Sequence, residues 1–261
     1  MKINFLNLVD DPKKYIKLKW DSFFNKLPIA YTPWLKRNTQ GHYSVVSAVY
    51  NVDKYLDDYF YSIINQTLIF DEHIELILVD DGSTDESAKI IKSWQKKYPN
   101  NIKYINKENG GQASARNLGL DLVTNKWVTF IDPDDFISKN YFELVDQQIA
   151  SDNKFCMISC NFLFYQEAKD SINDSHPLNY RFKDDISIIS ASSMGKFVQL
   201  SVNSAFFLTQ TIQDNNISMD VRIKPNFEDA HFVAKYLLSS KNDKVVFLKT
   251  PKYFYRKRKD D

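Results

Sequence analysis

The sequence predicts a three-layer, Rossmann-like α/β fold in which helices flank a mainly parallel central sheet. From residue 43 onward, short apolar runs of strand length alternate with amphipathic segments of roughly ten to fifteen residues, a pattern typical of βαβ crossovers. The chain has 261 residues and a hydrophobic content of 43%. That is enough for one large α/β domain.

Four expected strands in the first half are each followed by an expected helix. The strands cover residues 43–50, 74–80, 102–107 and 126–132, and the helices 53–66, 82–98, 110–122 and 138–149. In the second helical segment, Ser83 is followed three residues later by Glu86, which predicts a capping box at its start. Ser138 is the expected start of the fourth helix.

The second half of the chain is less periodic. We expect a strand over residues 155–166, a polar loop over 169–185, a helix over 191–200, an amphipathic helix over 227–240 and a last strand over 244–249.

Residues 1–42 have no clean period, and Pro28 and Pro33 interrupt them. We interpret them as an irregular N-terminal arm or as the end of a preceding region. The aromatic and basic stretch 23–37 could lie on a membrane surface or pack against the following domain, and the sequence leaves both open.

Composition excludes several classes of protein. Lys and Arg number 34 against 33 Asp and Glu, a net charge of +1, which argues against a nucleic-acid partner. No apolar run approaches the ~18 residues that span a bilayer, and the first residues lack a signal-peptide core. Cys156 and Cys160 lie in an expected strand with no second cysteine pair for zinc, so we expect buried reduced thiols. We therefore expect a cytoplasmic protein, with any membrane contact peripheral and at the inner face of the plasma membrane.

Three carboxylates follow the fourth expected strand in the stretch VTFIDPDDF, at Asp132, Asp134 and Asp135. Ligands of parallel sheets bind at the carboxyl ends of the strands. A solvated Asp-Pro-Asp turn is one interpretation, but the continuous apolar strand before it indicates burial. Buried carboxylates generally need a cation, and oxygen ligands without His or Cys favour Mg²⁺ or Mn²⁺.

Other polar groups follow the neighbouring strands. Asp80 and Asp81 end the second strand, where a carboxylate could accept hydrogen bonds from a base or a ribose. Gly110 and Gly111 open a helix, which suits an anionic ligand, and Arg116 in that helix could face a phosphate or be an ordinary surface arginine. The first strand is not followed by G-x-G-x-x-G, and no P-loop motif occurs, so dinucleotide and P-loop folds lose their main support.

Five motifs in order resemble the inverting family-two glycosyltransferases with the GT-A fold, over about residues 43–258. They are SVVSAVYNVDKYLDDYFYSIINQT, ELILVDDGSTDES, NGGQASARNLGL, VTFIDPDDF and NFEDAHF. The resemblance implies a nucleotide-sugar donor, most often UDP-linked, and Mn²⁺ or Mg²⁺ at an Asp-x-Asp motif. It also implies a nucleotide-binding half over residues 43–135 and an acceptor-binding half over 136–261.

The resemblance assigns roles to residues of the first half. Ala48 and Tyr50 would contact the nucleotide, as would Gly111 and Arg116, and Asp81 would face the uracil with Asp80 as the alternative. Asp134 would bind the metal directly, and Asp132 would lie between the metal and the ribose or donor sugar. Asp135 is expected to cap the entry to a helix.

In the second half, the resemblance makes Asp229 the general base and Glu228 a support for its orientation. The residues alone also allow an ordinary acidic first helical turn. His231 is expected to be a neutral helix residue rather than a ligand. Arg256 or Arg258 would belong to a loop that covers the donor diphosphate.

These assignments predict a metal-dependent inverting hexosyl- or N-acetylhexosaminyltransferase that uses a UDP-sugar and a saccharide or glycoconjugate acceptor. Its setting would be synthesis of a surface polysaccharide such as capsule or lipopolysaccharide, and the chain could be one domain of a longer enzyme. The alternative is a non-catalytic nucleotide-sugar-binding module of a larger polymerase. A sugar-nucleotide pyrophosphorylase would need a Gly-rich basic loop where AVYNVDKYL stands.

Overall fold

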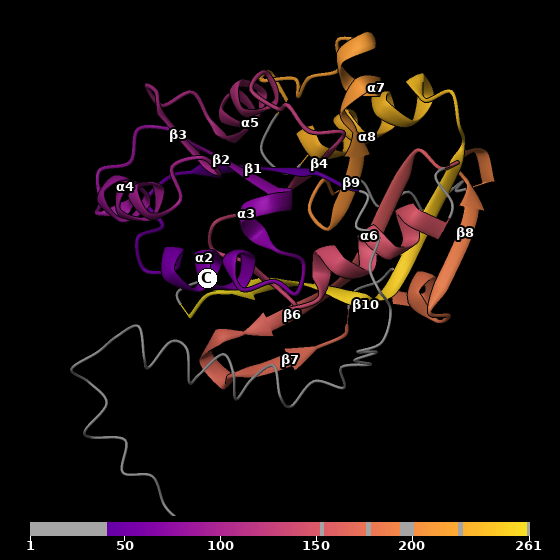
Figure 1. Cartoon of the computed structure of the whole chain (residues 1–261), viewed down its shortest axis with the longest axis horizontal. Coiled ribbons are helices and arrows are strands. Elements are labelled where there is room, and N and C mark those ends of the chain that lie inside the picture. Colours follow the sequence, from indigo (N-terminus) through magenta and orange to yellow (C-terminus); the bar gives the residue numbers. More distant parts are fainter. Residues whose placement is uncertain (1–40, 152–153, 176–178, 194–200, 224–226, 260–261) are drawn as a thin grey trace, which may run out of the picture. The chain divides into compact units, whose positions relative to one another are not determined.

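The computed structural model of the protein describes residues 41–151, 154–175, 179–193, 201–223 and 227–259 (Figure 1). Their strands form one mixed sheet in the order β3-β2-β1-β4-β9-β6-β10-β5, with β7 paired to β6 and β8 to β10. Strands β1 to β4 are mutually parallel, and β9 joins β4 in the antiparallel direction. The predicted α/β fold with a mainly parallel sheet is confirmed. The predicted N-terminal arm lies outside the described residues, except for positions 41 and 42.

The strands are β1 Tyr43–Val49, β2 Ile74–Asp80, β3 Ile102–Asn106, β4 Trp127–Phe130, β5 Phe136–Ile137, β6 Met157–Gln166, β7 Ser171–Asn173, β8 Ile186–Ser190, β9 Ala205–Leu208 and β10 Lys244–Lys257. The α-helices are α2 Leu56–Ile64, α3 Phe70–His73, α4 Ser87–Lys97, α5 Gln112–Leu120, α6 Tyr141–Ser151, α7 Thr209–Asp214 and α8 Glu228–Ser239. Short 3-10 turns occur at Glu167–Lys169, Asn179–Phe182 and Ala191–Ser193.

Two apolar clusters, one on each face of the sheet, give the fold its three layers. Helices α2, α4 and α6 contribute to one cluster and α5, α7 and α8 to the other. Strand β1 contributes side chains to both clusters, because successive side chains of a strand point to opposite faces of the sheet. Val45 and Val49 belong to the first cluster and Val46 to the second. Cys156 and Cys160 are buried free thiols, as predicted. No helix in the part of the chain that the structure describes is long and apolar enough to cross a bilayer.

Two predicted helix starts are wrong, because tertiary partners occupy the hydroxyl groups. Helix α4 begins at Ser87, and the Ser83 hydroxyl accepts a hydrogen bond from the backbone of Asn51 at 3.1 Å instead of capping it. Helix α6 begins at Tyr141, and the Ser138 hydroxyl accepts one from the backbone of Lys252 at 3.0 Å. Ser83 and Ser138 therefore connect segments that are distant in the sequence through these hydrogen bonds.

Short elements of the second half were missed. Strands β5, β7, β8 and β9 and helix α7 were not predicted, and β7 lies within the predicted polar loop. Strand β10 extends past the predicted end at residue 249, with a register shift between Leu248 and Lys252 that accommodates Pro251. Most of the helix predicted over 191–200 lies outside the described residues, and its first three form a 3-10 turn.

Helix α5 packs closely on β1 at Gly119, where a Cβ atom would lie 2.4 Å from Cγ1 of Val46. We expect Gly119→Ala to lower the free energy of unfolding by about 1–3 kcal/mol through overpacking, in spite of alanine's higher helix propensity. Urea unfolding measures the change. Gly110→Ala is the control, because its nearest contact is the flexible end of Lys107, and an equal loss in both variants would contradict this packing.

Candidate active site

A cleft of about 850 Å³ opens where β1, β2 and β4 end, opposite the start of α8. It brings together the predicted site residues except Asp80 and Arg256. Those that line it are Ala48, Tyr50, Asp81, Gly111, Arg116, Asp132, Asp134, Glu228 and Asp229, with Arg258 at the end of the chain. The strand-end rule therefore predicted correctly that these residues lie together in one cleft.

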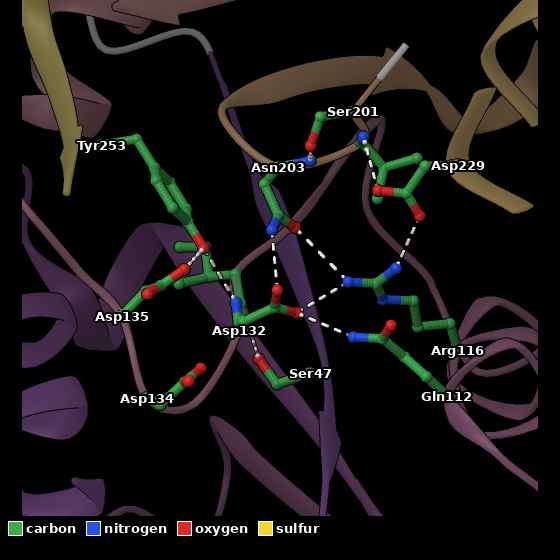
Figure 2. A network of polar contacts seen from close by, with 12 residues as sticks. Ser47, Gln112, Arg116, Asp132, Asp134, Asp135, Ser201, Asn203, Asp229 and Tyr253 are labelled. Atoms are coloured by element: carbon green, nitrogen blue, oxygen red, sulfur yellow. Dashed lines mark hydrogen bonds and ion pairs between the residues drawn. The ribbon is translucent and has the colours of Figure 1, made fainter. Parts of the chain in front are cut away.

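Arg116 of α5 lies at the centre of the cleft's polar network (Figure 2). Its Nη2 contacts Oδ1 of Asp132 and its Nη1 contacts Oδ1 of Asp229, both at 2.7 Å, and its side chain is only 2% exposed. Burial alone would lower the pKa of the guanidinium, but the two carboxylates outweigh it and raise the pKa. Arg116 therefore stays charged and joins two carboxylates, instead of standing open to a phosphate.

Asp132 has further partners that the sequence did not predict. The side-chain amide of Asn203 donates to its Oδ2 at 2.7 Å, and Gln112 donates to its Oδ1 at 3.4 Å. Asn203 precedes β9, in a segment without a recognisable motif. Both oxygens of Asp132 are thus held by donors of the protein.

Asp134 lies in the loop after β4, whereas Asp229 lies in the first turn of α8. Asp134 is paired with a different arginine, Arg258. Nε of Arg258 donates to Oδ2 of Asp134 at 3.0 Å, and Nη2 contacts the same oxygen. Burial and the charge of Asp132 raise the pKa of Asp134, against the effect of Arg258. Of the two arginines predicted to cover a diphosphate, Arg258 lines the cleft.

Arg256, the other candidate, has a structural position instead. Its side chain is 2% exposed and forms ion pairs with Asp58 at 2.9 Å and Glu167 at 3.0 Å. Its Nε donates to the backbone oxygen of Asp134 at 2.7 Å. Arg256 therefore fixes the loop that presents the Asp-x-Asp motif.

Asp135 was predicted to cap a helix entry, and this is wrong. Strand β5 follows it, and its buried carboxylate accepts hydrogen bonds from the hydroxyl of Tyr253 at 2.6 Å and the backbone of Arg256 at 2.8 Å. Burial, followed by the charges of Asp134 and Asp132, raises its pKa well above the usual range. Asp135 therefore holds the loop against β10.

The two carboxylates that end β2 have different surroundings. Asp80 is fully buried and accepts hydrogen bonds from the backbone of Ser83 at 2.8 Å and the hydroxyl of Tyr104 at 2.7 Å. Asp81 lines the cleft and accepts from Lys107 at 2.6 Å and from the backbone of Gly110 and Gly111 at 2.9 and 2.7 Å. Of the two alternatives for the base contact, Asp81 is the one that a ligand in the cleft can reach.

Gly111 has a φ of 87°, a conformation that favours glycine. Gly110 and Gly111 were predicted to suit an anionic ligand. In this structure, however, the anion that they bind is the carboxylate of Asp81.

At the start of α8, Asp229 is oriented by two donors. Besides Arg116, the backbone N–H of Val202 donates to its Oδ2 at 3.2 Å. Burial raises the pKa of Asp229 above the usual range, partly opposed by Arg116. Glu228, which was predicted to orient Asp229, is 3% exposed. Among the described residues, Glu228 makes no hydrogen bond to Asp229, and its Oε2 has no hydrogen-bond partner. His231 is exposed on α8 and does not line the cleft.

The donor set of the cleft fits a hard divalent cation. Within the described ranges, no group of three or more His, Cys, Asp or Glu side chains could hold a metal alone. Both Arg258 contacts fall on one oxygen of Asp134, so the ligands of a cation would be this carboxylate, with Asp132 beside it. Mg²⁺ and Mn²⁺ commonly use one or two carboxylates together with substrate phosphates.

The fold and the cleft define a GT-A protein. The family pattern of "Glycosyl transferase family 2" matches residues 44–193. The minor teichoic acid biosynthesis protein GgaA of Bacillus subtilis is 36% identical over 220 residues, which are 84% of this chain and 48% of the relative. Glycosyltransferase GlyA of Streptococcus pneumoniae is 32% identical over 83% of this chain and 30% of its own length. The chain belongs to glycosyltransferase family 2 and spans about half or less of these relatives.

Solved structures support the same fold. Residues 1–349 of Staphylococcus aureus TarS in complex with UDP-GlcNAc superpose with a TM-score of 0.72 and 24% identity, over 84% of this chain and 60% of that one. The mannosyltransferase PcManGT of Pyrobaculum calidifontis, in complex with GDP-Man and Mn²⁺, gives a TM-score of 0.64 and 15% identity, over 97% and 67%.

The Arg116 bridge predicts a pH-dependent loss of stability in Arg116→Met. Without the guanidinium, two part-buried carboxylates are uncompensated, so we expect the free energy of unfolding to fall by about 3 kcal/mol near neutral pH. The pKa of Asp229 is already raised and will rise further, so the native state of the variant takes up a proton as the pH falls. The loss should therefore shrink toward about pH 4, near the unfolded-state pKa of aspartate.

Denaturant unfolding at several pH values measures this loss. Arg222→Met is the matched control, because Arg222 pairs with Asp220 while 86% exposed and should show no measurable change. The assigned contacts would be contradicted if Arg116→Met did not lower the free energy of unfolding, or lowered it by the same amount at every pH.

Proposed function

We propose that this chain is a metal-dependent inverting glycosyltransferase. It would transfer a hexosyl or N-acetylhexosaminyl group from a UDP-sugar to a hydroxyl of a saccharide or glycoconjugate. The observation that carries this proposal is the assembly, in one cleft, of Asp81, Asp134 and Asp229 around the charged bridge of Arg116. The relatives in teichoic acid synthesis favour a role in making a bacterial cell-surface polymer.

The donor would bind across the ends of β1 and β2. Ala48, Tyr50 and Asp81 line that part of the cleft and would contact the nucleotide. The TarS complexes with UDP and UDP-GlcNAc support a uridine nucleotide. Asp132 would contact the ribose or donor sugar while Arg116 and Asn203 fix its orientation.

Asp134, with Asp132 beside it, would hold Mn²⁺ or Mg²⁺. The cation would supply positive charge to the diphosphate as it leaves. The PcManGT complex with Mn²⁺ supports this cofactor class. Arg258 at the rim would add a second positive charge to the same region.

Asp229 would act as the general base. The acceptor hydroxyl loses its proton to Asp229 as its oxygen attacks the anomeric carbon, and the bond from that carbon to the UDP oxygen breaks. Attack from the face opposite UDP inverts the configuration and needs no covalent enzyme intermediate. A raised pKa brings Asp229 nearer to the operating pH, which favours base catalysis, and the contacts to Arg116 and Val202 keep its carboxylate oriented.

We expect Asp229→Asn to reduce sugar transfer at least about a hundredfold, because the amide cannot accept the proton. UDP affinity should change much less than the rate, since the proposed nucleotide contacts are Ala48, Tyr50 and Asp81 rather than Asp229. UDP release from UDP-sugars with Mn²⁺ and calorimetric binding of UDP measure the two quantities. Asp121→Asn, at an exposed position, is the control. UDP binding without turnover in the unmodified chain, over all donors and acceptors, would favour the non-catalytic module.

We expect Asp134→Asn to remove most of the gain in UDP affinity that Mn²⁺ provides, because the amide is a weaker ligand for a hard cation. Calorimetric titration of UDP with and without Mn²⁺ measures this gain for the unmodified chain, Asp134→Asn and Asp121→Asn. A full Mn²⁺ effect in Asp134→Asn would show that the metal binds elsewhere.

A further inference from the structure

Two exposed aromatic rings line the cleft and come from different elements of the fold. Tyr50 follows β1 and is 52% exposed, and Phe227 immediately precedes α8 and is 68% exposed. Among the described residues, Tyr180 is the other aromatic side chain with comparable exposure, and the guanidinium of Arg181 lies 5.9 Å from its ring. An apolar group left exposed in a groove is typical of a ligand-binding surface.

Phe227 lies outside the apolar core of the part of the chain that the structure describes. It belongs to neither apolar cluster, and no aromatic ring of the described residues contacts it. Its backbone is nevertheless held in place, because its carbonyl oxygen accepts a hydrogen bond from the N–H of His231 at 3.2 Å. The adjacent Glu228 is buried, so the first turn of α8 presents one side chain outward and one inward.

The position of Phe227 connects it with the acceptor. The proposed nucleotide contacts come from the ends of β1 and β2 and from α5, whereas Phe227 lies two residues before Asp229 on α8. The substrate next to the general base must be the one that loses a proton, which is the acceptor.

The charges around Phe227 limit the chemistry of that acceptor. The two residues that follow it, Glu228 and Asp229, also line the cleft, and both are acidic. The arginines among the described lining residues are Arg116 and Arg258, and both are already paired with carboxylates. A phosphate at this position would meet negative charge, whereas the C–H face of a pyranose ring packs favourably on an aromatic face.

We propose that Phe227 is the stacking platform for a neutral pyranose ring of the acceptor and presents one of its hydroxyl groups to Asp229. This inference rests on the proposed function and adds the acceptor class, a cyclic sugar rather than an open-chain polyol phosphate. Tyr50, which follows β1, would contact the nucleotide instead.

Saturation-transfer NMR on the full chain with UDP and Mn²⁺ tests the proposal. The probes are methyl β-D-glucopyranoside and methyl N-acetyl-β-D-glucosaminide on one side, and sn-glycerol 3-phosphate and ribitol 5-phosphate on the other. The variants are Phe227→Ala, Phe227→Tyr, which keeps a ring, and Leu238→Ala. Leu238 is the matched control, because it is an apolar residue of the same helix that is 89% exposed and outside the cleft.

We expect saturation transfer to at least one pyranoside, strongest on the protons of one ring face, and none to the polyol phosphates. Phe227→Ala should weaken pyranoside binding about fivefold or more, while Phe227→Tyr and Leu238→Ala bind as the unmodified chain does. Pyranoside binding unaffected by Phe227→Ala, preferential binding of a polyol phosphate, or no pyranoside binding to the UDP complex would overturn the inference. If UDP itself fails to bind, the proposed function fails, so the two failures are distinguishable.

Discussion

The double ion pair of Arg116 is the interaction on which the cleft depends. Burying a guanidinium costs several kcal/mol, which contacts of good geometry must offset. Arg116 makes two such contacts, both at 2.7 Å, to carboxylates that the chain delivers from the end of β4 and the start of α8. The three groups keep a net negative charge, so the site binds its own arginine and still favours an additional cation.

The C-terminal strand completes the site in a similar way. Strand β10 crosses the sheet beside β6 and brings Tyr253, Arg256 and Arg258 to the loop that follows β4. Arg256 and Tyr253 fix the backbone and Asp135, so that Asp134 and Asp132 keep their positions in the cleft. The Asp-x-Asp motif is therefore held by residues more than a hundred positions away in the sequence.

The sequence predicted what depends on local pattern. Regular alternation located the parallel strands of the first half, and the strand-end rule placed Asp81, Asp132 and Asp134 in one cleft. What failed depends on tertiary partners: Ser83 and Ser138 were taken as helix caps, but their hydroxyls bond to distant backbone. Asp135 was taken as a helix cap, and its actual partners, Tyr253 and Arg256, lie far along the chain on β10. Strands β5 and β7 are too short to show a period, β8 and β9 lie in the less periodic second half of the chain, and no sequence motif marks Asn203.

The central claim is that this charged cleft binds a nucleotide diphosphate with a divalent cation. Thermal unfolding of the chain with Mn²⁺ and either UDP, GDP or CDP tests this binding, because a ligand that binds the native state raises the midpoint by an amount that grows with the logarithm of its concentration relative to its Kd. We expect a clear increase with UDP in the presence of Mn²⁺ and a smaller one without the cation. The same midpoint with and without each nucleotide, with Mn²⁺ present throughout, would contradict it.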